Sequence, residues 1–86
     1  MWVLTEDKKL VNLAHASIIS VSADGEHVYA STPGLGAFEG HSYHLCYAWT
    51  PETARMVIRR IGDAIARGEA FLDIMDALAH LEEDAR

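Results

Sequence analysis

The fold is decided by residues 43–67, which read YHLCYAWTPETARMVIRRIGDAIAR. The first seven residues place large aromatic and apolar side chains at odd-numbered positions, the period-two pattern of a strand with one aromatic face. Thr50 can accept hydrogen bonds from free N–H groups at a helix start, and Pro51 suits the first helical position. The stretch therefore predicts a strand that runs directly into a helix over 51–67.

The helix carries an apolar stripe at helical spacing. Its members are Ala54, Val57, Ile58, Ile61 and Ile65. Such a stripe faces a core, so we expect it to lie flat on a sheet while the arginines and Asp63 face water. Gly68 is expected to end the helix in a left-handed cap.

Upstream of this stretch the pattern predicts hairpins. Short β-prone runs at 1–5 and 10–13 flank the polar residues 6–9, and the dipeptide Asp24-Gly25 separates runs at 17–22 and 27–30. Asp-Gly is a strong hairpin turn because both positions tolerate positive φ. Residues 31–42 hold a proline and three glycines and are expected to form a loop.

The tail is open to two interpretations. Phe71, Ile74, Met75, Leu78 and Leu81 form a helical stripe, which favours a helix over 70–83, although residues 70–74 could also join a sheet edge as a strand. This second stripe could serve as a partner surface or fold back on its own domain. The sequence thus predicts one α+β domain over 1–86, with a β-meander of four to five antiparallel strands (1–49) packed against helix 51–67 and a C-terminal helix or edge strand over 70–83.

The order of these segments resembles a group of short bacterial proteins of uncharacterised function. The likeness covers residues 1–68 and is carried by Trp2-Val3-Leu4-Thr5, Leu10-Val11-Asn12-Leu13, an aromatic strand and a helix that begins at Thr-Pro-Glu. It departs at Lys8-Lys9, where those proteins have a glycine, and at the long loop 31–42. The resemblance implies a small β-meander packed on one helix, and it implies no activity.

Charge and cysteine content narrow the classes of function. Thirteen acidic residues against seven basic ones give a net charge of −6, which repels nucleic acids and anionic membranes. The single cysteine cannot form an internal disulfide, and no apolar run approaches the roughly 20 residues of a membrane span. The N-terminus also lacks the pattern of a signal peptide, so we expect a cytoplasmic protein.

The histidines give the one candidate metal site. His27, His41 and His44 lie on or beside neighbouring predicted strands, and alternation places Cys46 on the same face as His44. These four residues could surround a zinc ion, although half-buried residues without an ion would give the same pattern. Cys46 has no third group to orient a base for catalysis, and the glycines at 34–40 do not match a nucleotide-binding loop.

Three classes of function remain. The first is a non-enzymatic interaction or assembly module that forms a homodimer or binds another protein, since half of so short a chain is apolar. The second is a small metal-binding protein that uses the histidine and cysteine ligands above. The third is a small enzyme or ligand carrier with a pocket between sheet and helix, lined by Tyr43, Tyr47 and Trp49; filling of that gap by Ile58 and Ile61 would argue against it.

Overall fold

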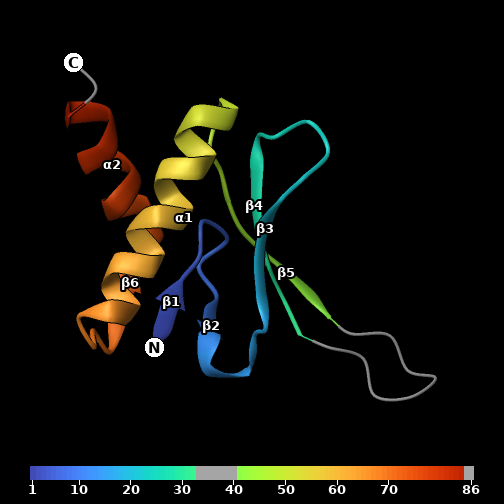
Figure 1. Cartoon of the computed structure of the whole chain (residues 1–86), viewed down its shortest axis with the longest axis vertical. Coiled ribbons are helices and arrows are strands. Elements are labelled where there is room, and N and C mark those ends of the chain that lie inside the picture. The colour runs from blue at the N-terminus through green and yellow to red at the C-terminus, as the bar shows by residue number, and fades with distance from the viewer. Residues whose placement is uncertain (33–40, 85–86) are drawn as a thin grey trace.

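The computed structural model describes residues 1–32 and 41–84 and shows an α+β arrangement of two small sheets and two helices (Figure 1). Sheet A has the strand order β2-β1-β6, and sheet B has the order β3-β4-β5. The strands are β1 (Trp2–Leu4), β2 (Leu10–Asn12), β3 (Ile18–Val21), β4 (His27–Ser31), β5 (Ser42–Tyr47) and β6 (Phe71–Asp73), and the helices are α1 (Pro51–Ala66) and α2 (Ile74–Asp84).

The predicted meander is divided between the two sheets. Each predicted hairpin is present, because β1 pairs with β2 and β3 pairs with β4, both antiparallel. Between the hairpins, however, Leu13–His15 form a short 3₁₀ helix, which begins where the Asn12 side chain accepts the N–H of Ala14. This turn separates β2 from β3 along the chain, so the expectation of four to five strands in one sheet is not met.

The second hairpin turns at Asp24 and Gly25, as the sequence predicts. Gly25 has a φ of +77°, and the Asp24 carboxylate accepts the hydroxyl of Ser22 and the N–H of Glu26. These hydrogen bonds, the one from Ser22 first, lower the pKa of Asp24. The turn is thus held by its own side chains.

Strand β5 contains an irregularity that reorders its two faces. Cys46 pairs with Val28 while His44 pairs with Tyr29, so Leu45 has no partner and forms a bulge. Since Val28 and Tyr29 are consecutive and face opposite ways, His44 and Cys46 also lie on opposite faces. The expectation that they share a face is therefore wrong.

Helix α1 begins as predicted. The Thr50 side chain accepts the N–H of Thr53, and Pro51 occupies the first turn. Ile58 is partly buried, whereas Ile65 is 54% exposed and its place in the predicted stripe is taken by Ala64. The fully buried positions on α1 are Ala54, Val57, Ile61 and Ala64.

The C-terminal segment contains both of the predicted elements, first a short strand and then a helix. Phe71–Asp73 form β6, which pairs in parallel with β1, and α2 follows at once over Ile74–Asp84. The Asp73 side chain accepts the N–H of Met75 and so helps to begin α2. Because Leu78 is buried and α2 packs against α1, the helix folds back on its own domain.

The predicted loop is shorter than expected at both ends. Strands β4 and β5 extend to Ser31 and Ser42, and beyond them Thr32 and His41 still exchange hydrogen bonds. The glycine stretch at 34–40 lies outside the described residues.

Candidate functional site

The turn between β1 and β2 reaches across to the outer edge of β5 and joins the two sheets. The Glu6 N–H donates to the Leu45 carbonyl at 2.9 Å, and the Glu6 carboxylate accepts the Tyr47 N–H at 3.2 Å. Glu6 therefore covers two backbone groups that an edge strand would otherwise expose. The turn itself is pinned by Thr5, which is 2% exposed and whose hydroxyl accepts the N–H of Lys9.

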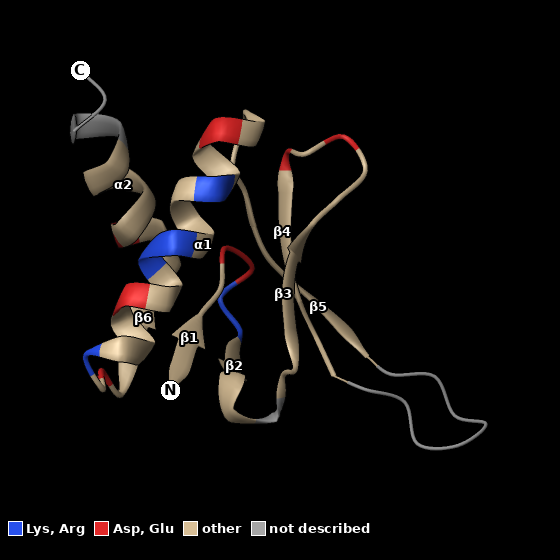
Figure 2. Cartoon of the chain, viewed as in Figure 1, with Lys and Arg blue, Asp and Glu red and all other residues tan. Residues whose placement is uncertain are grey.

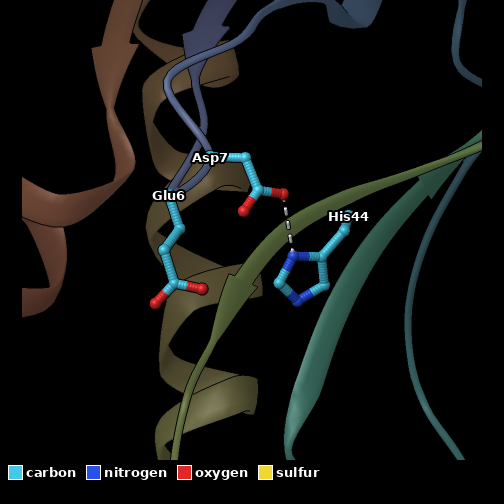
Figure 3. Close-up of side chains that lie close together, drawn as sticks. All are labelled: Glu6, Asp7 and His44. Atoms are coloured by element: carbon cyan, nitrogen blue, oxygen red, sulfur yellow. Dashed lines mark hydrogen bonds and ion pairs between the residues drawn. The ribbon is translucent and has the colours of Figure 1, made fainter.

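This contact brings two carboxylates beside a histidine (Figure 3). His44 Nδ1 lies 3.4 Å from the Asp7 carboxylate oxygen Oδ2. One candidate ligand atom from each of Glu6, Asp7 and His44 lies within 4.8 Å of the other two. Asp7 and His44 are 52% and 25% exposed in their side chains, so the group is open to solvent.

A second histidine, His27, lies in contact with His44. His27 Nδ1 lies 3.0 Å from His44 Nε2, and the two rings are centred 5.2 Å apart. Tyr29 and Tyr47 flank the pair, with ring centres 5.3 Å from His44 and 5.0 Å from His27, respectively. One face of sheet B thus carries a contiguous group of polar aromatic side chains, and Asp7 contacts this group at His44.

The four ligands predicted from the sequence do not meet at one site in the structure. It joins His27 to His44, places His41 just before the start of β5 with its ring beside Tyr43, and buries Cys46 completely on the other face. Burial, with the negative charge of Glu6 as a second cause, raises the pKa of Cys46 to about 12. A thiol with that pKa is protonated at neutral pH, so it is a poor nucleophile, and its place on the opposite face keeps it away from His44.

Two acidic residues complete the cluster, and the sequence analysis did not select them. Glu6 and Asp7 belong to a polar hairpin turn, 38 and 37 positions before His44, and such turns are usually solvated. Their position beside His44 follows from the unpaired edge of β5, and that edge can be recognised only when the strand order of sheet B is known.

The proposed pocket between sheet and helix is filled by packed side chains. Val57 and Ile61 are each 1% exposed within the core, and Ile58 packs partly against it. Tyr43 lies elsewhere, in a groove of about 330 Å³ beside Trp2 and Leu10. Neither Tyr47 nor Trp49 lines that groove.

Two arginines of α1 and the arginine of the turn after it lie beside acidic groups on a helix that carries both charges (Figure 2). Arg55 is 3.7 Å from Glu52, and the Glu69 carboxylate is 3.3 Å from Arg60 and 3.9 Å from Arg67. These are ion pairs on a solvated helix face, as the sequence predicts.

The outer face of sheet A is apolar and uncovered. Alternation turns Val3 and Leu72 toward the core, where they are 0% and 5% exposed. The neighbouring positions point the other way, and there Trp2, Phe71 and Leu10 are 49%, 51% and 60% exposed. This set, with the half-buried Leu4 on the same face, is called the open face below.

Comparisons with known proteins add no relative. Searches against protein families, curated proteins and solved structures each found no match. Within the described residues, no helix has the length and apolar character needed to cross a bilayer.

Proposed function

We propose that this chain is a small assembly module that forms a homodimer through the open face of sheet A. The observation that carries the proposal is the pair of half-exposed aromatic rings, Trp2 and Phe71, side by side on adjacent strands. Aromatic residues in such clusters are typical centres of protein interfaces.

The register of sheet A makes the open face continuous. Trp2 lies between Asn12 and Phe71 in one row, and Leu4 lies between Leu10 and Asp73 in the next. Asp73 is thus the one charged residue among these six positions. Two copies of a chain with a net charge of −6 could meet here with little direct repulsion.

The shape of the open face favours a second copy as the partner. The groove beside it, formed by Trp2, Leu10 and Tyr43, has room for an aromatic side chain, and Phe71 projects from the strand on the other side of β1. A two-fold axis would place Phe71 of each copy in the groove of the other, since an isologous interface uses one patch twice.

The size of the patch sets the expected affinity. A large aromatic side chain can bury about 150–250 Å², so the two half-exposed rings, the exposed Leu10 and the partly buried Leu4 offer roughly 300–400 Å² per copy. A standard interface buries about 800 Å² per partner. Here, half of that area or more would have to come from polar residues around the open face. We therefore expect a concentration-dependent dimer and not an obligate one.

Sedimentation equilibrium over a range of concentrations tests the proposal. The chain should dimerise at tens to hundreds of micromolar, and Phe71→Ser should weaken the dimer at least tenfold. Met56→Ser, which changes an exposed side chain on α1 that is not part of the open face, should leave the dimer unchanged. Far-UV circular dichroism and urea unfolding show whether both variants fold. A wild-type chain that stays at 9.5 kDa throughout, or a Phe71→Ser variant that dimerises as before, would refute the proposal.

A further inference from the structure

We infer that Glu6, Asp7 and His44 form a binding site for one zinc-type divalent ion, independent of the open face. The site lies where the β1–β2 turn meets the edge of β5, and it replaces the ligand set that the sequence favoured. Two carboxylate oxygens and one imidazole nitrogen form a donor set that zinc accepts, with a fourth position left for water or an added ligand.

The separation of Asp7 and His44 fits two ligands better than a strong ion pair. A charge-assisted hydrogen bond between a nitrogen and a carboxylate is about 2.7–2.9 Å long. Two ligands on a tetrahedral zinc ion, with bonds of about 2.1 Å, are about 3.4 Å apart. The observed Nδ1 to Oδ2 distance is 3.4 Å.

Glu6 brings the third ligand from a fixed position. Its backbone N–H and its carboxylate are both bonded to β5, through Leu45 and Tyr47. A carboxylate held at one oxygen still has lone pairs on both oxygens. All three ligand atoms lie within 4.8 Å of one another, so small side-chain rotations of Asp7 and His44 toward Glu6 would close the set around an ion.

His27 supports the site without touching the ion. If His44 donates from Nδ1 to Asp7, then its Nε2 accepts a hydrogen bond from His27 Nδ1. An ion on His44 Nδ1 requires the proton on Nε2, so the bond to His27 reverses direction and His27 becomes the acceptor. A histidine ligand that donates its other N–H to a neighbour in this way is the usual arrangement of metal sites.

Cys46 and His41 supply matched controls for this assignment. Cys46 is fully buried on the face opposite His44, and His41 is an exposed histidine just before β5 that is absent from the cluster. The sequence-based ligand set requires both residues, whereas the site inferred here requires neither.

Isothermal titration with ZnCl₂, on protein without a histidine tag, tests the inference. We expect one ion per chain, a loss of binding of at least a hundredfold in His44→Ala, a loss of about ten- to a hundredfold in His27→Ala, and unchanged binding in His41→Ala and Cys46→Ala. Cobalt titration should give the visible absorption of a tetrahedral ion without the near-ultraviolet band of a cobalt–thiolate bond.

Three results would overturn the inference. They are no zinc binding at 100 µM protein, equal binding by wild type and His44→Ala, or a thiolate band that vanishes in Cys46→Ala. Urea unfolding of each variant shows that a lost site is not a lost fold. Because the titration counts ions per chain, its outcome does not depend on whether the protein dimerises.

Discussion

Cys46 should be almost inert to thiol reagents in the folded protein. The side chain is 0% exposed, and burial raises its pKa from 9.0 to about 12, with the Glu6 charge as the smaller cause. The reactive species is the thiolate, whose fraction at neutral pH falls tenfold for each unit by which the pKa rises. A difference of three units therefore lowers the thiolate fraction about a thousandfold.

Labelling with a chromogenic disulfide at pH 7.5 measures this effect. The rate in buffer should be at least a thousandfold below the rate in concentrated urea, where the thiol has its ordinary pKa. Glu6→Gln, which removes the second cause of the shift, should label somewhat faster than wild type when folded and at the same rate when unfolded. A native rate within tenfold of the unfolded rate would refute the reasoning.

The same shift predicts a loss of stability in alkali. Because the folded pKa lies above the unfolded one, the folded state holds its thiol proton more tightly. This contribution is intact below about pH 9 and is lost as the pH rises from 9 toward 12, at up to about 1.4 kcal/mol per pH unit. Cys46→Ala should lack this part of the slope, whatever its stability at neutral pH; parallel slopes for both proteins in urea unfolding between pH 9 and 10.5 would contradict it.

Two pairs of substitutions test the packing. Ile61→Ala should lower the free energy of unfolding by about 2–5 kcal/mol because Ile61 is 1% exposed, whereas Ile65→Ala at a 54% exposed position should cost less than about 1 kcal/mol; equal losses in urea unfolding would show that α1 is rotated. Gly25→Ala and Gly68→Ala both meet the roughly 1–2 kcal/mol cost of a positive φ, but a Cβ at Gly25 would also lie 2.9 Å from Pro51 Cγ, so Gly25→Ala should have the lower melting temperature; the reverse order would place the β3–β4 turn away from α1.

Structural features that depend on residues close together in the chain can be predicted from the sequence. The Thr50 cap needs the N–H of Thr53, three positions away, and the Asp24-Gly25 turn needs the positive φ of Gly25 and the hydrogen bonds of Asp24 to Ser22 and Glu26. Both features are local, so residue type at a fixed offset predicts them.

The sequence does not predict which side chains share a face of β5, because the bulge at Leu45 is set by pairing with β4. Strict alternation predicts His44 with Cys46, and one extra residue reverses that relation. The strand β6 poses a similar problem, since three residues carry little periodicity. Phe71–Asp73 are held by parallel pairing with β1, some seventy positions earlier in the chain.

The cluster of Glu6, Asp7 and His44 depends on both of these long-range features. The bulge turns His44 away from the core, and the pairing of β1 within sheet A directs its turn toward the free edge of β5. In the sequence each of the three residues reads as an ordinary polar residue of a turn or a half-buried strand. Their shared chemistry arises from the junction of two sheets, and Glu6 makes that junction by supplying a backbone donor and a carboxylate acceptor to the same strand. A carboxylate that covers an open sheet edge is thereby already positioned as a ligand, so one residue would serve both the fold and the ion.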